Sequence, residues 1–404
     1  MLPLPSSGSE RLGSLVLPEL NHMTTLMSRG RHLSCSFIAQ LVVINTPINT
    51  KPLNFSNPNF TRVPVSQKIE EETLPDYIAS RYYPARIGEI FQGRSTVWLA
   101  RDMNHCGYVT IKIFIKSASM GQQLDDELQM YKRVERGSKN HPGHSAIRSL
   151  LDSFDVDGPE DKHRCLVHFP LWESRLPSLV LAFVLKRLFL ALDYLHTECQ
   201  IIHADIKADN IMFGIADDSV FRDFTEDELQ NPCPRKELDG RIIYESRELR
   251  MPREWGAPVL CDFGSAIPGG IEHLEDIQPN IYRAPEVILE VPTYSVDMWN
   301  VGCMIWNIFE SESLFTGFDP EFRAYRTRGK LRHKFFSDDN DFCANFLLED
   351  RLPLEQRETT LEGQDKAQFV RLIQKMLQWE PEKRSSAKEL QEDEWICRNL
   401  ESTH

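Results

Sequence analysis

The chain has 404 residues, with 41% hydrophobic and 26% charged residues, which gives enough apolar content for one large domain or two small ones. Its formal net charge of -14 argues against nonspecific nucleic-acid binding and favours basic partners or substrates. The nine cysteines include no Cys-x-x-Cys pair, so the sequence indicates neither a zinc site nor a disulfide scaffold, and a reducing compartment fits best.

Residues 1–75 form a leader that the sequence predicts to be unstructured. Between Asn21 and Ile69 there is no acidic residue, whereas lysines and arginines occur among serines, threonines and asparagines. This composition resembles an organellar transit peptide, so a mitochondrial location is one reading. The other reading is a disordered tail without a targeting role, or a misassigned start codon, and it favours the cytoplasm or the nucleus. No apolar run in the chain approaches the roughly 18 residues that a membrane-spanning helix needs.

From Leu74 onward the pattern becomes globular, first rich in strands and then rich in helices. Runs of β-branched and aromatic residues predict strands at 95–100, 108–115 and 165–167. Apolar residues at helical spacing predict helices at 124–134, 179–196, 296–309 and 367–378. This order favours an α+β protein built as two lobes.

Two short segments carry the chemistry. Asp205, Lys207 and Asn210 lie close together in the segment His203–Asn210, and Asp262 opens an Asp-Phe-Gly triplet further along the chain. Asp205 is the candidate base for a substrate hydroxyl, and Lys207 is spaced to offset charge on a transferred phosphate. Asn210 and Asp262 offer oxygen ligands of the kind that magnesium prefers. Together they predict phosphoryl transfer from Mg-ATP to a hydroxyl.

An ion pair is expected to support these groups. Lys112 lies on a predicted strand and Glu127 on the helix that follows it. Pairing of the two side chains would hold the ammonium against the α- and β-phosphates of a nucleotide.

Three further interactions are expected to stabilise the helical lobe. Glu286 and Arg384 are predicted to form a buried ion pair with no catalytic role. Asp297 is expected to accept hydrogen bonds from backbone amides of the His203–Asn210 segment, because a buried carboxylate needs partners. His203 is expected to pack beneath Phe263 as a structural residue.

These motifs resemble those of eukaryotic protein kinases over roughly residues 75–398. The matching segments are Val109–Lys112, His203–Asn210, Asp262–Gly264 and Ala284–Glu286. The resemblance is strongest to the SR-protein kinase group, especially its fungal members, because residue 204 is alanine where most kinases have arginine. It implies a two-lobed kinase domain over residues 76–398, with an N-lobe at 76–168 and a C-lobe at 169–398. Residues 213–257, approximately, resemble the acidic insert that this group carries before the Asp-Phe-Gly triplet.

The resemblance implies a serine/threonine kinase that uses ATP and Mg2+ and modifies protein substrates. These substrates are expected to be rich in arginine and serine, and an acidic enzyme would attract them electrostatically. The nucleotide would contact Val97 and Thr110, and the Phe169 carbonyl and the Leu171 amide would hold adenine. A monomer is expected, with no direct nucleic-acid partner and no membrane partner.

Three segments depart from the family pattern. The two glycine positions of the phosphate loop fall on Ile90 and Gln92, although glycine lets backbone amides approach phosphate closely. Only about five residues follow Trp172 before the long predicted helix, and the docking helix of the family is shortened near residues 323–330. Residues 83–89 are the remaining candidate for the first strand of the expected N-lobe. These losses leave open a catalytically impaired pseudokinase that acts as a protein-binding scaffold, or missing exons.

Overall fold

The computed structural model describes residues 41–44, 55, 57–75, 77–83, 85, 87, 96–102, 107–115, 120–157, 162–172, 178–271, 277–289, 291–315 and 352–401. All of them belong to one unit, residues 37–404. The three segments that depart from the family pattern, at residues 88–95, 173–177 and 323–330, lie outside the described residues.

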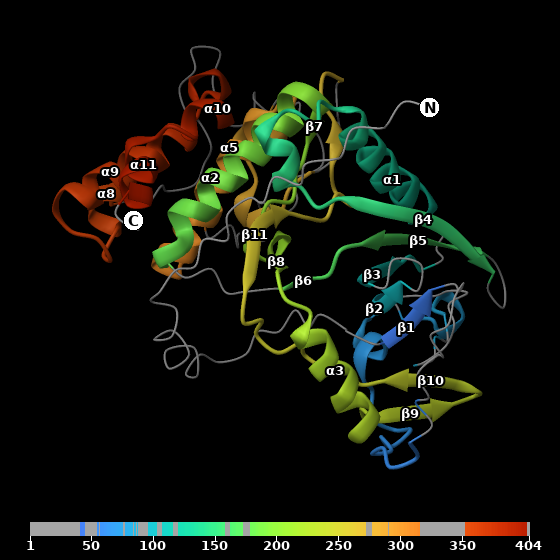
Figure 1. The fold of residues 1–404 in the computed structure, drawn as a ribbon. Coiled ribbons are helices and arrows are strands. Elements are labelled where there is room, and N and C mark those ends of the chain that lie inside the picture. The colour runs from blue at the N-terminus through green and yellow to red at the C-terminus, as the bar shows by residue number, and fades with distance from the viewer. Residues whose placement is uncertain are drawn as a thin grey trace, which may run out of the picture. The chain divides into compact units, whose positions relative to one another are not determined.

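Five strands form the N-lobe sheet, in the order β1-β2-β3-β5-β4 (Figure 1). The strands β2 to β5 pair in antiparallel fashion, and β1 pairs in parallel with β2. Their bounds are Leu41–Ile44 for β1, Thr96–Asp102 for β2, Gly107–Ile113 for β3, Leu150–Asp157 for β4 and Lys162–His168 for β5. The three strands predicted from the sequence correspond to β2, β3 and β5 and are confirmed.

The edge strand β1 comes from the predicted leader. Its residue Leu41 lies opposite Leu99 of β2, so this sheet edge is completed by a segment far from it in sequence. The expectation that residues 83–89 supply the first strand is wrong for the positions that the structure describes. Tyr83, Ala85 and Ile87 lie outside any strand and instead pack against the apolar face of the sheet.

The two faces of strand β3 have different surroundings. Val109, Ile111 and Ile113 are buried in a core with Trp98 of β2. Because successive side chains of a strand point to opposite faces, Thr110 and Lys112 share the other face. This alternation is why Lys112, the one lysine of the strand, points toward Glu127 and Asp262.

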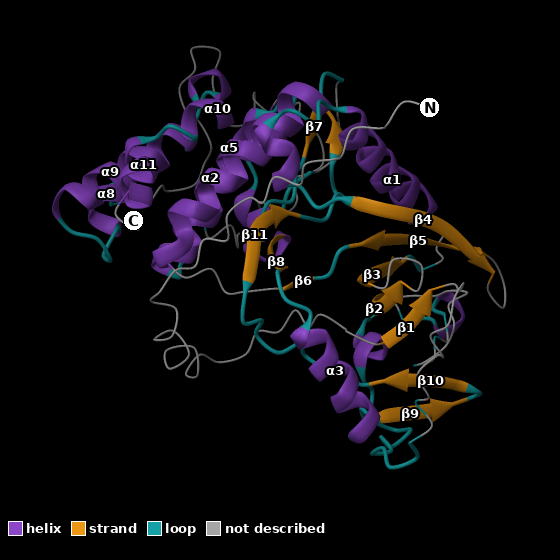
Figure 2. Cartoon of the chain, viewed as in Figure 1, coloured by secondary structure: helices purple, strands orange, loops and turns teal. Residues whose placement is uncertain are grey.

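Helices build the second lobe (Figure 2). The apolar helix α2, Ser178–Tyr194, continues into a π-helical turn at Leu195–Cys199. It shares a core with α5 and α9, in which Phe189, Trp306 and Phe369 are almost fully buried. The described helices of this lobe also include α4 Pro285–Leu289, α5 Ser295–Glu310, α8 Leu354–Arg357, α9 Gly363–Met376, α10 Ala387–Leu390 and α11 Glu394–Glu401. Helix α1, Met120–Arg136, instead lies between β3 and β4 in the strand-rich part of the chain. The four predicted helices correspond to α1, α2, α5 and α9 and are confirmed.

Two further small sheets lie among the loops that follow β5, and short 3-10 helices are spread along the described chain. The sheets have the orders β11-β8-β6 and β12-β7. Their strands are β6 Leu171–Trp172, β7 Ile201–Ile202, β8 Ile211–Ile215, β11 Trp255–Leu260 and β12 Ile267–Pro268. The 3-10 helices are Glu70–Thr73, Ala79–Arg81, Pro142–Ala146, Ala208–Asn210, Asn280–Tyr282 and Pro381–Lys383.

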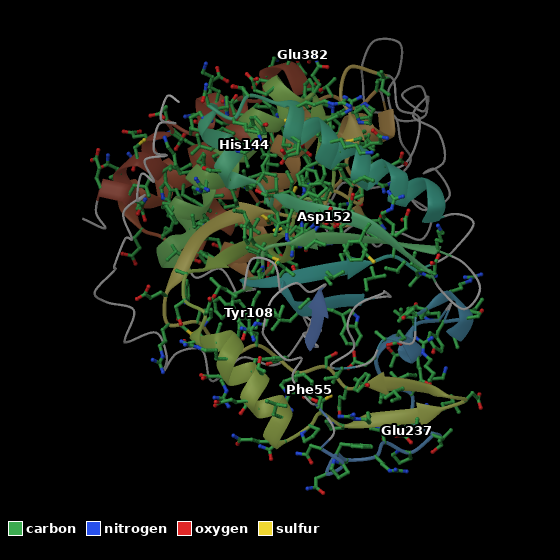
Figure 3. The ribbon with its side chains drawn as sticks, turned by 45° about the vertical axis from the view of Figure 1, so that its right-hand side comes forward. Phe55, Tyr108, His144, Asp152, Glu237 and Glu382 are labelled. Atoms are coloured by element: carbon green, nitrogen blue, oxygen red, sulfur yellow. The ribbon has the colours of Figure 1, made fainter. Side chains whose placement is uncertain are left out.

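The insert between β8 and β11 is folded. It contains helix α3, Ser219–Gln230, and a hairpin of β9, Arg235–Leu238, with β10, Arg241–Tyr244. Phe221 of α3 stacks on Tyr108 of β3 with ring centroids 4.8 Å apart, and Phe55 joins this apolar cluster (Figure 3). The insert therefore leaves the C-lobe and packs on the N-lobe.

A strap, defined as residues 57–75 and 77–83, ties the leader to this insert. Glu72 and Lys236 form a buried ion pair at 2.8 Å, with side chains 8% and 3% exposed. Glu71 pairs with Arg241 at 3.0 Å. The strap also joins the β9 backbone, since the amide of Val63 donates to the carbonyl of Arg235 over 2.9 Å. The prediction of an unstructured leader over residues 1–75 is therefore wrong for β1 and for the strap. Basic side chains of the insert neutralise the acidic groups of the strap. The composition of the leader alone does not show this pairing.

The result is an α+β structure with a strand-rich lobe and a helical lobe, as predicted. No helix among the described residues combines the length and the apolar character needed to cross a membrane.

Candidate functional site

Three of the predicted residues meet at one ammonium group. The Nζ atom of Lys112 on β3 lies 2.9 Å from Oε2 of Glu127 on α1 and 3.0 Å from Oδ1 of Asp262. The predicted pair is thus present, and it extends to the Asp-Phe-Gly triplet 150 positions further along the chain.

Opposing effects set the charges of this trio. Burial alone would lower the pKa of Lys112, but the carboxylates of Glu127 and Asp262 outweigh it, so the pKa is raised and the ammonium persists. Burial would raise the pKa of Asp262, yet the neighbouring ammonium holds it below its ordinary value. Burial raises the pKa of Glu127 despite Lys112. The site therefore keeps one cation beside the carboxylate of Asp262.

A second group of predicted residues meets in the loop between β7 and β8. The ammonium of Lys207 donates to Oδ2 of Asp205 over 2.9 Å. The amide nitrogen of Asn210 donates to the same oxygen over 3.1 Å and to the backbone carbonyl of Asp205 over 2.8 Å. Burial would lower the pKa of Lys207, but Asp205, with a smaller contribution from Asp262, raises it. The loop therefore holds a carboxylate between a cation and an amide.

Helix α5 holds this loop from below. Oδ2 and Oδ1 of the fully buried Asp297 accept from the backbone amides of His203 and Ala204 over 2.8 and 2.9 Å. Asn300 accepts from the amide of Ile206 and donates to its carbonyl over 3.0 and 2.6 Å. Ala204 has a positive φ of 62°, so this support maintains a strained backbone. The expected role of Asp297 is confirmed.

The two catalytic segments are joined by pairing of β8 with β11. Ile211 lies opposite Leu260, and the amide of Cys261 donates to the carbonyl of Asn210 over 2.8 Å. The ring of His203 lies 5.3 Å from that of Phe263, and its Nε2 lies 3.1 Å from the Cys261 carbonyl. His203 is therefore a packing residue beneath the Phe263 turn, as expected.

The oxygen atoms of Asp262 and Asn210 that make no hydrogen bond within the described residues are suited to binding a divalent cation. Asp262 uses Oδ1 for Lys112 and for the amide of Gly264. Asn210 uses its nitrogen for Asp205. Within the described part of the chain, Oδ2 of Asp262 and the amide oxygen of Asn210 have no hydrogen-bond partner. These two hard oxygen donors fit Mg2+. The described residues contain no cluster of three or more His, Cys, Asp or Glu side chains able to hold a metal by themselves.

The residues expected to hold adenine form a further group around Thr110 of β3. Thr110 is buried and donates its hydroxyl toward the carbonyls of His168 and Phe169, at 3.3 and 3.4 Å. Leu171 lies in β6 opposite Gly214. Val97 lies opposite Lys112 in the sheet, while its side chain is outside the described residues. The contacts of these residues with a nucleotide stay a prediction.

Sequence reasoning missed several supporting residues. Arg148 donates to the hydroxyl of Thr110 over 2.8 Å, although nothing in its local sequence singles it out. Gln278 has a φ of 68° and holds the segment before Ala284, whose amide donates to its Oε1 over 2.9 Å. By contrast, the predicted pair of Glu286 and Arg384 is present and buried. Glu286 and Arg384 are 98 positions apart, so their pairing could be predicted only from the order of the sequence motifs that contain them.

Comparison with known proteins agrees with this geometry. The family model for the protein kinase domain matches residues 250–396. A serine/threonine protein kinase of Aspergillus fumigatus is 35% identical over 383 residues, which cover 84% of this chain and 93% of the relative. The serine/threonine-protein kinase SRPK of Physarum polycephalum is 25% identical over 404 residues, covering 81% of this chain and 92% of the relative. SRSF protein kinase 3 of Mus musculus is 31% identical over 171 residues, covering 37% of this chain and 30% of the relative.

Proposed function

The chain belongs to the serine/threonine protein kinases, and from this membership we propose how its residues transfer the γ-phosphoryl group of ATP to arginine- and serine-rich protein substrates. The single observation that carries the proposal is the meeting of Lys112, Glu127 and Asp262 at one cation, beside the loop that contains Asp205.

Asp205 acts as the base. Its Oδ2 is held by Lys207 and Asn210, so Oδ1 remains for the hydroxyl of the incoming serine or threonine. As the oxygen of the hydroxyl bonds to phosphorus, the proton passes to Asp205 and the bond from the γ-phosphorus to the β-phosphate oxygen breaks. Lys207 keeps its positive charge and offsets the negative charge that spreads over the transferred group.

Lys112 positions the nucleotide. Because Glu127 orients the ammonium and is buried beneath it, Lys112 reaches the cleft with a defined direction. Its contact with the α- and β-phosphates would replace its present contact with Asp262 and release that carboxylate. Asn210 and Asp262 would hold Mg2+, which supplies charge neutralisation for the β- and γ-phosphates when bound.

The acidic balance of the protein supports a basic substrate. A net charge of -14 lowers the free energy of encounter with arginine-rich peptides and suppresses binding of acidic ones. Relatives whose names contain SRPK and SRSF protein kinase point to the same substrate class. We also propose that the enzyme works as a monomer in the cytoplasm or nucleus.

The proposal is tested by phosphate incorporation into an Arg-Ser repeat peptide with Mg-ATP. The full chain is expected to incorporate phosphate, and Asp262→Asn should remove at least 99% of it, about the loss that follows removal of one well-placed transition-state contact. Asp239→Asn is the matched control, because Asp239 is exposed at the β9–β10 turn and its φ of 50° suits asparagine.

Two readouts separate an active kinase from the impaired alternative. Incorporation should require Mg2+, and a nucleotide should raise the unfolding temperature of the full chain and of Asp239→Asn. Absence of both incorporation and a nucleotide-induced shift would instead favour the scaffold reading. An equal rate for the full chain and Asp262→Asn would refute the assigned role of Asp262.

A further inference from the structure

A buried arginine lies beside Thr110 and Phe169, where the base of the nucleotide is expected. Arg148 is only 9% exposed, and its backbone amide donates to the carbonyl of Leu260 over 2.9 Å. Its Nη2 donates to the hydroxyl of Thr110 over 2.8 Å and approaches the carbonyl of Phe169 at 3.4 Å. The guanidinium therefore lies on the same face of β3 as Lys112.

Arg148 has no direct ion pair among the described residues, and part of its hydrogen-bonding capacity is unused, although the more distant carboxylate of Glu127 interacts with its charge. No carboxylate of the described residues lies within ion-pair distance of it, and its buried Nε has no hydrogen-bond partner among them. The neighbouring His168 is similar, since its Nδ1 contacts the Ser149 carbonyl at 2.9 Å while its buried Nε2 has no partner in the described residues. Burial, reinforced by Arg148, lowers the pKa of His168 well below its ordinary value, so this ring is neutral.

Burying a cation in this way costs free energy. A buried cation that no carboxylate contacts directly loses most of its hydration and recovers only part of it. Buried donors without partners are uncommon, and each calls for an explanation. A ligand that brings hydrogen-bond acceptors to this end of the cleft would supply the missing partners.

The base of a purine nucleotide has those acceptors on one edge. N7 accepts in both adenine and guanine, whereas position 6 carries an amino donor in adenine and a carbonyl acceptor in guanine. Arginine pairs with both acceptors of guanine but meets a donor at position 6 of adenine. The Phe169 carbonyl, which would accept from the adenine amino group, already faces the hydroxyl of Thr110 and the guanidinium of Arg148.

We propose that Arg148 is a base-specificity residue that lets this kinase use GTP as a phosphoryl donor alongside ATP. The inference rests on the proposed function, because it takes the location of the base from the roles of Phe169 and Lys112. The transfer itself is unchanged. The bond between the γ-phosphorus and the β-phosphate oxygen breaks, the new bond forms to the substrate hydroxyl, its proton passes to Asp205, and GDP leaves.

The first test is the ratio of kcat/KM for GTP and ATP, measured with the full chain and an Arg-Ser repeat peptide. The two values are expected to lie within about tenfold of each other. Arg148→Met should lower the ratio of GTP to ATP by roughly tenfold to a hundredfold, the discrimination that one bidentate base contact provides. Arg250→Met is the matched control, because Arg250 is 65% exposed on the insert, and it should leave the ratio unchanged.

The second test measures binding alone and does not depend on catalysis. Isothermal titration calorimetry with ADP, GDP and IDP separates the contribution of the 6-carbonyl group to affinity from that of the 2-amino group, since IDP has the 6-carbonyl of guanine without its 2-amino group. GDP and IDP should both lose affinity in Arg148→Met while ADP does not. Arg148→Lys, which keeps the charge but loses the bidentate geometry, should give an intermediate ratio.

The two tests distinguish failure of the proposed function from failure of the role assigned to Arg148. If neither triphosphate supports transfer, the proposed function fails, and the diphosphate affinities still decide the role of Arg148. If GTP is used more than a hundredfold less efficiently than ATP, or if Arg148→Met leaves the diphosphate ratio unchanged, the inference is overturned. The unfolding midpoint of each variant is measured first, and Arg148→Lys, which keeps the buried charge, tests the role of this residue if Arg148→Met does not fold.

Discussion

The ion pair between Glu286 and Arg384 provides the sharpest test of how the helical lobe is held together. Two parallel contacts join the side chains, 2.5 Å from Nη1 to Oε1 and 2.8 Å from Nη2 to Oε2. The two side chains are 2% and 0% exposed. Arg384 also donates to the carbonyl of Ser295 over 3.0 Å and lies 5.0 Å from the ring of Trp299. Among the described residues, the carboxylate of Glu286 is the charge that pairs with this fully buried guanidinium.

We expect Glu286→Gln to lower the free energy of unfolding by about 3–5 kcal/mol, the cost of leaving one partner of a buried pair uncompensated. The remaining carbonyl contacts are dipoles and do not replace a full negative charge. Urea unfolding followed by tryptophan fluorescence measures the change, because Trp299 lies beside the pair.

A neighbouring surface pair is the control. Glu380 and Lys383 approach to 2.7 Å, but their side chains are 61% and 62% exposed. Glu380→Gln should therefore cost at most about 1 kcal/mol. The double variant Glu286→Leu with Arg384→Met removes both charges and should recover much of the lost stability. If Glu286→Gln costs no more than Glu380→Gln, or if the double variant is worse than the single one, the argument from a stranded buried charge is refuted.

Three other outcomes follow from the geometry. Glu72→Gln should detach the strap by leaving Lys236 without its buried carboxylate, and it should destabilise the protein by about 3–5 kcal/mol in the same urea assay. Burial raises the pKa of Cys233 to about 12, so its alkylation at pH 8 should be slow in the full chain and faster in Glu72→Gln, as mass spectrometry would show. The capping contacts with Ser386 hold the pKa of Glu389 below its ordinary value, so the stability from this carboxylate is present above pH 4.5 and is lost as the pH falls through its folded pKa. Glu389→Gln should therefore differ from the parent at pH 7 and converge with it in acid, and an equal difference at both pH values would contradict this.

That the candidate catalytic residues would lie together could be predicted, because their order and local spacing reflect chemistry within short segments. Asp205, Lys207 and Asn210 lie within a few positions of one another, and the structure shows them hydrogen-bonded. The pairing of Lys112 with Glu127 was predictable for the same reason, since a strand followed by a helix brings them to one face. The additional contact from Lys112 to Asp262 depends on the meeting of the two lobes and had no local signal.

The leader shows where composition misleads. The stretch from Asn21 to Ile69, which has no acidic residue, suggests a basic, unstructured tail. Yet the next three residues, Glu70 to Glu72, meet basic groups and a backbone amide of an insert more than 160 positions away. The partners of these three glutamates lie in the insert, whose composition is acidic. Composition gives the number of charges in a segment but does not show which of them are neutralised by other parts of the chain. Only the folded structure shows that part of the leader is ordered and that basic side chains of the insert neutralise its glutamates.

The amino-acid sequence alone determined the class of chemistry, because phosphoryl transfer requires particular side chains at short, ordered spacings. It also determined the main helices and strands, since apolar periodicity is a local property of the chain. Only the tertiary structure decided which distant charges neutralise one another, that the insert and the strap share one interface, and that Arg148 points toward Thr110. These features depend on contacts between residues far apart in sequence, where burial sets the energy of each charge and no local pattern records it.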